Sequence, residues 1–114
     1  MTLPKSIRIA AHAALDKKAE NVVALDLREQ SDFTDHFLLV SGGNQRQLVA
    51  IADAIQEALR AAGHRPDHLE GYPRREWILL DYAAFVVHVF TPKTREFYDL
   101  ERLWGGAKRA EIAG

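Results

Sequence analysis

The segment REWILLDYAAFVVHVF, at residues 75–90, is apolar through most of its length, and two polar side chains inside it, Asp81 and His88, could act as an acid and a base. If a two-residue turn at 83–84 joins two strands, Leu79 faces His88, and Asp81 lies diagonally across from His88 on the same face. Acid–base catalysis also needs a nucleophile or a bound water, and no neighbouring residue supplies either. The pattern therefore favours a hydrogen-bonded Asp and His at a sheet surface over a catalytic pair.

Two glycines between a predicted strand and a predicted helix could bind a phosphate group. Gly42 and Gly43 follow the run DHFLLVS, and their backbone N–H groups could face an anion at the start of the helix. The arrangement resembles the active site of nucleotidyltransferases, which also needs acidic metal ligands one residue apart. No strand carries such a pair, because Asp26 stands alone and Asp81 ends its strand. The glycines favour a plain turn, with a nucleotide-binding enzyme as the alternative.

Other reactive side chains lack the setting that their chemistry needs. Ser41 is not in a nucleophile elbow, because Leu39 stands where the first glycine of that motif would be. His64 and His68 are four residues apart, but Pro66 between them breaks the helix that would place both on one face. The absence of cysteine excludes disulfides, thiolate nucleophiles and cysteine-ligated metals. These settings therefore indicate no catalytic residue and no metal site.

The composition is that of one ordinary soluble domain, with 114 residues of which 47% are hydrophobic and 27% charged. A net charge of -1 argues against an electrostatic grip on a long stretch of phosphate backbone, so little direct nucleic-acid binding is expected. The N-terminal segment lacks the apolar core of a signal peptide, because Arg8 and His12 interrupt it. No stretch approaches the roughly 20 apolar residues of a membrane span. We predict a cytoplasmic protein without membrane contact.

The hydrophobic periodicity predicts a single α/β domain, in which a mixed sheet of about four or five strands is flanked by helices. Helices are predicted over 4–19, over 44–63 with Asn44 as the N-cap, and after Pro92; strands are predicted at 22–27, 35–41, 77–82 and 85–90, with a short one near 68–70. The last eight residues are expected to fray. The domain is thus assigned to 1–106 and a flexible tail to 107–114.

Aromatic side chains are concentrated in the last third of the chain. Some must build the core, but Trp77 beside Arg75 and Glu76, and Tyr82 beside Asp81, are expected to stay partly exposed. Aromatic side chains ringed by charged ones are typical of hot spots in protein interfaces. The residues alone therefore favour a binding module over an enzyme.

Four segments together resemble the ribosomal silencing factor family, also called the Iojap family: KKAENVVALDLREQSDFTDHFLLVSG at 17–42, QLVAIADAI at 47–55, LEGYPRREWILLDYAAFVVHVF at 69–90 and FYDLERLWGG at 97–106. The resemblance covers nearly the whole chain, with Asn44 in a place where a serine is expected. It implies a nucleotidyltransferase-like fold used without catalysis, so we predict no enzyme activity and no cofactor. It also implies a translational repressor that binds the large ribosomal subunit at its fourteenth protein and blocks joining of the small subunit when nutrients are short.

The resemblance also implies which residues contact the partner. Trp77 and Tyr82 are the expected anchors, and the expected polar partners are Glu70, Asp81, His88, Asp99 and Glu101. Carboxylates suit this role because ribosomal proteins are basic. For Leu100 and Trp104, packing of a helix against the sheet is the better interpretation. The same apolar surface could join two free copies into a homodimer, and the sequence leaves monomer and dimer both open.

Overall fold

A computed structural model describes residues 2–112 of the protein. The elements along the chain are α1 (Lys5–Asp16), β1 (Glu20–Asp26), β2 (His36–Ser41), α2 (Gln45–Ala61), β3 (His68–Glu70), β4 (Trp77–Asp81), β5 (Phe85–Phe90), α3 (Pro92–Tyr98), α4 (Leu100–Leu103) and β6 (Lys108–Glu111). The strands form one sheet in the order β3-β4-β5-β2-β1-β6. Strands β2 and β5 are parallel, and the other neighbouring strands are antiparallel. The prediction of one α/β domain with a mixed sheet is confirmed.

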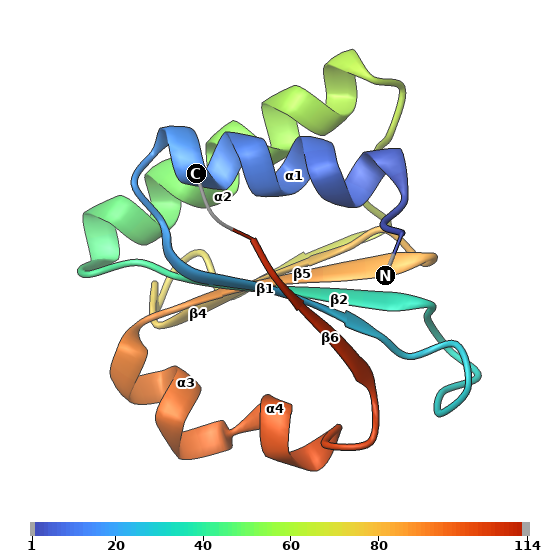
Figure 1. Cartoon of the computed structure of the whole chain (residues 1–114). Helices are drawn as coiled ribbons and strands as arrows, with labels where there is room; N and C mark the ends of the chain where they lie inside the picture. Colours follow the sequence, from blue (N-terminus) through green and yellow to red (C-terminus); the bar gives the residue numbers. More distant parts are fainter. Residues whose placement is uncertain (1, 113–114) are drawn as a thin grey trace.

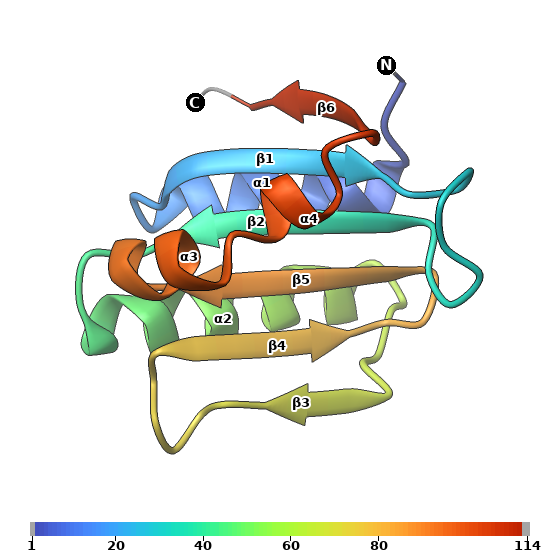
Figure 2. The same ribbon diagram turned by 90° about the horizontal axis from the view of Figure 1, so that it is seen from below.

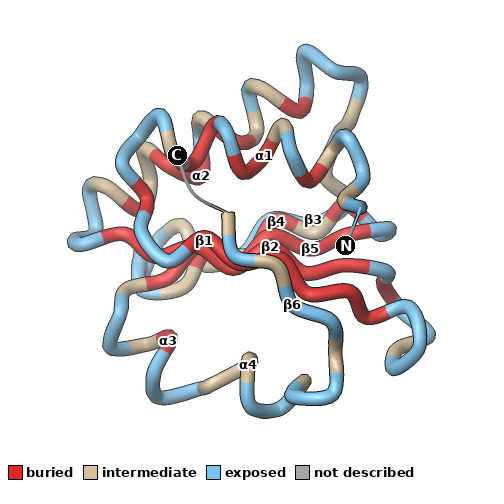
Figure 3. Tube along the Cα trace, in the orientation of Figure 1, coloured by how far each residue is buried: buried red, intermediate tan, exposed pale blue. Residues whose placement is uncertain are grey.

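Helices cover the two faces of the sheet unequally. The long helices α1 and α2 lie side by side on one face, and the short helices α3 and α4 lie on the other (Figure 1, Figure 2). The central strands β2 and β5 are buried along their whole length (Figure 3). Because both of their faces are covered, their sequences are almost continuous apolar runs rather than alternating ones.

The side chains of β4 alternate between the two faces and so divide the core into two layers. Ile78 and Leu80 pack beneath α1 and α2, whereas Trp77 and Leu79 pack on the side of α3 and α4. This period of two follows from the pleat of a strand. The parity of a residue on β4, that is, whether its number is odd or even, therefore decides which face of the sheet its side chain can reach.

The hairpin between β4 and β5 has the predicted register, with Leu79 opposite His88. The N–H of Tyr82 donates to the carbonyl of Phe85 over 2.9 Å, which closes the two-residue turn. Ala83 has a φ of 65°, and its N–H donates to the carboxylate of Asp81 over 2.8 Å. That hydrogen bond offsets part of the strain of a left-handed alanine.

The sheet has one strand more than the upper expectation, because Lys108–Glu111, assigned to the tail at 107–114, pair with β1 as β6. Most side chains of β6 are exposed, so no apolar pattern in the sequence marks it as a strand. It forms because the edge of β1 offers unpaired backbone groups. Residues 113 and 114 of the assigned tail lie outside the described residues.

The helical segment after Pro92 is interrupted at Asp99, whose φ of 47° ends α3 and precedes α4. As predicted, a helix begins at Pro92; Thr91 is its N-cap, and the Oγ of Thr91 accepts a hydrogen bond from the N–H of Thr94 over 3.2 Å. None of the helices within residues 2–112 combines the length and apolar character needed to cross a membrane.

Candidate protein-binding site

Asp81 and His88 share a face of the sheet but form hydrogen bonds to other groups. One carboxylate oxygen of Asp81 accepts the N–H of Ala83, and the other lies 4.0 Å from Nδ1 of His68. Nδ1 of His88 instead accepts a hydrogen bond from Nε1 of Trp77 over 3.0 Å. The predicted register is therefore confirmed, but Asp81 and His88 do not form the hydrogen bond that we expected between them.

His88 is an internal support for Trp77 rather than a surface group. It is only 4% exposed, and the edge of its ring meets Phe37 with 4.4 Å between the ring centroids. Burial lowers the pKa of His88 to about 3, so its ring is neutral at neutral pH. Because Nδ1 accepts the indole proton, the ring proton must sit on Nε2. The role of polar contact expected for His88 does not suit a side chain so buried.

Tyr82 lies in the core, and the expectation that it stays partly exposed is wrong. It is 8% exposed and stacks on Phe85 with ring centroids 4.8 Å apart, beneath the long helices. The reason is parity, because residue 82 points to the opposite face from Trp77 and Asp81. Its role as a contact anchor, which the resemblance implies, does not suit so buried a position.

An exposed aromatic pair extends from Trp77 across the face opposite the long helices. The ring of Tyr98 lies 4.8 Å from that of Trp77, and Phe97 meets Tyr98 edge-on at 5.0 Å. Phe97 is 78% exposed and Tyr98 54%, whereas Trp77 is half-buried. We call these three residues the aromatic surface. A groove beside it is lined by Lys93 and Glu76 together with Phe97 and Tyr98.

Sequence reasoning missed Phe97 and Tyr98 as exposed groups. In α3 the buried residue is Arg95, and this arginine occupies the side of the helix where an aromatic would be expected. The signal that could have found them is the short length of α3, since seven residues cannot bury every large side chain that they carry.

Acidic side chains lie on the same face of the sheet as the aromatic surface. Strand pairing sets Glu70 opposite Leu79 and His68 opposite Asp81, which puts Glu70 and Asp81 on the same face as Trp77. Glu70 is exposed and Asp81 half-buried. The structure thus places three of the seven predicted contact residues, Glu70, Trp77 and Asp81, on one face of the sheet. Asp99 follows Tyr98 directly and is half-buried at the junction of α3 and α4.

Glu101 is already paired within the protein. Its two carboxylate oxygens accept hydrogen bonds from Nε of Arg95, over 2.8 Å, and from the guanidinium of Arg109, over 2.5 Å. Burial opposes ionisation of Glu101, but the hydrogen bonds from the two arginines outweigh it and hold the pKa of the carboxyl below its usual value. Its expected role as a polar partner is therefore replaced by an internal one.

Arg95 connects this ion pair to the sheet. It is 8% exposed, and its guanidinium also donates to the carbonyl of Asn21 over 2.6 Å and to Oγ of Ser41 over 2.9 Å. The guanidinium carbon lies 5.7 Å from the centroid of Phe90. Arg95, Glu101 and Arg109 form a cluster, here called the arginine clasp, that joins α3, α4 and β6 to β1 and β2.

The backbone N–H groups of the glycine turn are used inside the protein. The N–H of Gly42 donates to the carbonyl of Phe90 over 3.0 Å, and that of Gly43 to Oε1 of Gln47 over 2.6 Å. A Cβ on Gly42 would lie 2.8 Å from a methyl carbon of Leu48, so close packing accounts for this glycine. Residues 2–112 also contain no group of three or more His, Asp and Glu side chains placed to hold a metal ion. The arrangement suits a plain strand-to-helix turn.

Comparison with known proteins decides the family. The profile of the family described as "Ribosomal silencing factor during starvation" matches residues 1–114. A ribosomal silencing factor of Halalkalibacterium halodurans is 39% identical over 114 residues, which are 100% of this chain and 97% of that protein. The chain belongs to the ribosomal silencing factor family. This family is generally one of non-enzymatic regulators that bind the ribosome.

Other relatives extend the ribosomal silencing factor family in sequence and structure. A crystal structure of a Chromobacterium violaceum protein, 32% identical, superposes with a TM-score of 0.88 and covers 100% of this chain and 95% of that one. The chloroplastic protein Iojap of Zea mays is 29% identical over 102 residues, which are 90% of this chain and 44% of that protein. The Chromobacterium violaceum structure shows that the whole described fold recurs in a relative. In the present protein, Leu100 and Trp104 pack on the sheet, as predicted.

Proposed function

We propose that this ribosomal silencing factor represses translation by binding the large ribosomal subunit at its fourteenth protein and blocking the joining of the small subunit. The observation that supports the contact is the aromatic surface, where Phe97 and Tyr98 lie exposed beside Trp77, on the sheet face that also carries Glu70 and Asp81. Large aromatic anchors bordered by polar groups are the usual hot spots of protein interfaces.

The charge of this side of the molecule suits a basic partner. Residues 20–43 and 67–112, which form the sheet with α3 and α4, hold eight Lys and Arg against thirteen Asp and Glu. Four contact residues from the sequence, Glu70, Trp77, Asp81 and Asp99, stay in the proposal, and Phe97 and Tyr98 are added. Opposite charge on a basic ribosomal protein would steer the two surfaces together and suppress wrong partners.

Steric exclusion is sufficient for repression under this proposal. The factor measures 35 × 33 × 27 Å, so a copy held at the surface where the small subunit docks would keep the two subunits apart. No chemical step is required. The family description supports a role during starvation, and we infer that the factor acts in the cytoplasm in stationary phase.

We also infer that free copies form a homodimer through the surface that later binds the ribosome. Phe97 and Tyr98 are in contact with each other, and each is more than half exposed. Exposed apolar groups that lie close together favour association. Binding to the ribosome and dimer formation would then compete.

The scaffold supports a nucleotidyltransferase-like interpretation without catalysis. Open α/β sheets bind ligands outside the carboxyl ends of parallel strands, and here β2 and β5 end together at the turn before α2. The alternative function, a nucleotide-binding enzyme that uses Gly42 and Gly43, is disfavoured because both N–H groups have acceptors inside the protein. Calorimetry with ATP and Mg²⁺ tests this alternative, and saturable binding would support it.

Joining of separated subunits tests the proposed function. Purified small and large subunits are mixed with excess factor, and 70S formation is followed on a sucrose gradient. We expect 70S particles to decrease with the wild type and to recover when Trp77 and Tyr98 are changed to alanine. Leu69→Ala is the matched control, because Leu69 is an exposed apolar residue that pairs with Leu80 and faces the other side of the sheet. Undiminished joining with excess wild type would contradict the proposal.

A further inference from the structure

The two layers of the molecule carry opposite charge. Residues 2–19 and 44–66, which form α1, α2 and their flanking turns, hold seven Lys and Arg against three Asp and Glu. The remainder of the described chain holds eight against thirteen, as stated above. The net charge of -1 thus averages a positive helical layer of +4 and a negative layer of -5. Whole-chain charge therefore hides a surface that could meet an anion.

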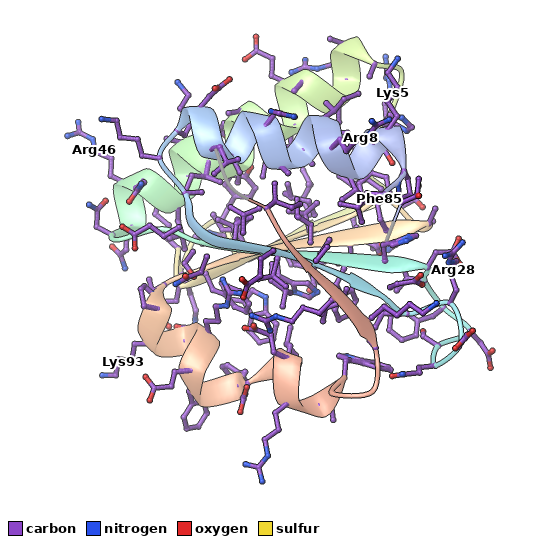
Figure 4. The ribbon with its side chains drawn as sticks, viewed as in Figure 1. Lys5, Arg8, Arg28, Arg46, Phe85 and Lys93 are labelled. Carbon is purple, nitrogen blue, oxygen red and sulfur yellow. The ribbon has the colours of Figure 1, made fainter. Side chains whose placement is uncertain are left out.

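Four cations of the helical layer lie at one end of it. Lys5 and Arg8 are at the start of α1 and line a shallow pocket together with Ala58 of α2, and Asp16 lines the same pocket from the other end of α1. Lys5 and Arg8 point away from the sheet at that end of the molecule (Figure 4). Arg60 and Arg65 come from the end of α2 and the turn after it. We call these four residues the basic end.

The basic end is not neutralised within the protein. All four side chains are exposed, and none forms an ion pair within residues 2–112. Among the acids of the helical layer, Asp16 lies at the far end of α1, and Asp53 accepts a hydrogen bond from Tyr72 over 3.0 Å. Of these three acids, Glu57 is the one near the basic end, one helical turn before Arg60 on α2, and it forms no ion pair with Arg60.

The helical layer has cations but no large apolar anchor. Within residues 2–112, the exposed large hydrophobic residues are Phe33, Leu69, Phe97, Tyr98 and Leu103, and none of them belongs to α1 or α2. The exposed residues that follow Arg60 are the small Ala61, Ala62 and Gly63. A protein partner would need buried anchors, whereas a phosphate backbone needs only cations and room for close approach.

We propose that the basic end binds the phosphate backbone of RNA without reading its sequence. This inference rests on the proposed function, since the large subunit supplies RNA around the ribosomal protein that the opposite face would hold. Lys5 and Arg8 are separated by about 4.5 Å along the helix axis, and each can neutralise one phosphate. The factor would then hold protein with its acidic, aromatic face and RNA with its basic helical layer.

Titration with a labelled RNA duplex of about 20 base pairs tests the proposal on the whole chain. The wild type is expected to bind this duplex saturably at low salt, as a non-specific contact does. Changing all four cations of the basic end to glutamine should weaken binding at least about tenfold. It should also lower the salt slope by about 3, since each phosphate contact contributes roughly 0.7 to 0.9.

A second quadruple variant controls for net charge, because it removes the same number of cations from the acidic layer: Arg74→Gln, Arg75→Gln, Arg102→Gln and Lys108→Gln. This control should bind the duplex nearly as well as the wild type. Equal loss in both variants, or equal binding by the wild type and the basic-end variant, would overturn the proposal. Tighter binding to poly-glutamate than to RNA would overturn it too and assign the surface to acidic proteins.

The same proteins separate this inference from the proposed function. The basic-end variant should bind the purified fourteenth ribosomal protein as the wild type does, while its affinity for whole large subunits falls. Failure of the wild type to bind either of these partners would remove the proposed function but not the RNA contact seen with the duplex. Loss of RNA binding alone would leave the protein contact intact.

Discussion

Trp77 donates its indole N–H to Nδ1 of His88 over 3.0 Å, so a buried neutral histidine fixes the orientation of the half-buried tryptophan at the centre of the aromatic surface. The low pKa of His88, about 3, follows from burial. A protonated ring would lose its acceptor at Nδ1 and could no longer accept the indole proton. The pair therefore links the core of the hairpin to the proposed ribosome contact.

His88→Phe should weaken partner binding without removing any exposed contact. The phenyl ring fills similar space but leaves the indole N–H of Trp77 without an acceptor, which costs about 1–3 kcal/mol of stability. Urea unfolding measures that loss, and titration with the ribosomal protein measures affinity. The control is the double variant with Trp77→Phe, which removes the donor as well. If the two losses add fully instead of partly cancelling, the hydrogen bond does not couple these residues.

Stability should rise with pH across the acidic range because of His88. The unfolded histidine titrates near its ordinary pKa of 6.5, whereas the folded one has a pKa of about 3. Between these values only the unfolded state binds the proton, so stability is fully present above pH 6.5 and falls as pH decreases toward 3. The contribution is about 1.4 kcal/mol per pH unit. Urea unfolding at several pH values from 5 to 6.5 measures how the free energy of unfolding changes with pH. This free energy should depend less on pH in His88→Phe than in the wild type. An equal pH dependence in both proteins would contradict the low pKa of His88.

Gly71 supports the start of β4, and its replacement should be far more damaging than that of a second glycine with the same backbone. Gly63 and Gly71 have φ values of 92° and 90°. A Cβ on Gly71 would lie 1.8 Å from the carbonyl oxygen of Trp77, whereas a Cβ on Gly63 would meet nothing within 4 Å. Gly63→Ala should cost about 1–2 kcal/mol for the left-handed backbone alone.

Gly71→Ala should exceed that cost, since the backbone of β4 must move, and it should weaken partner binding by displacing Trp77. Thermal unfolding and titration of both alanine variants give the comparison. If Gly63→Ala and Gly71→Ala lost equal stability, the contact between the new Cβ and the Trp77 carbonyl would be avoided without disturbing β4, which would contradict this prediction.

The elements that the sequence predicts are those with strong local patterns. The register of the β4–β5 hairpin follows from a two-residue turn, and the helix at α2 follows from an apolar stripe with Asn44 as its cap. Strand β6 has no such pattern, because backbone pairing with the edge of β1 rather than burial of side chains forms it. Edge strands of this kind depend on their neighbour and not on their own composition.

The positions of the predicted contact residues follow from strand geometry in some cases and from tertiary packing in others. Trp77, Glu70 and Asp81 gather on one face because strand parity and pairing place them there. Tyr82 was assigned to a surface from its charged neighbour, although its parity sends it to the core. The exposure of Phe97 and Tyr98 depends on Arg95 being buried, and a buried cation is a tertiary feature that hydrophobic patterns do not reveal.

The arginine clasp should contribute more stability than a surface ion pair. Glu101→Ala leaves the buried Arg95 without its carboxylate partner. Breaking a fully buried ion pair costs about 3–5 kcal/mol. Because the Glu101 side chain is 22% exposed, we expect a smaller loss of stability, about 2 kcal/mol. Glu111→Ala is the matched control, because Glu111 pairs with Arg109 at 3.3 Å but its side chain is 78% exposed. That control should change the free energy of unfolding by less than about 0.5 kcal/mol. Urea unfolding at neutral pH measures both, and similar small losses would mean that Arg95 is held by Ser41 and Asn21 without help from Glu101.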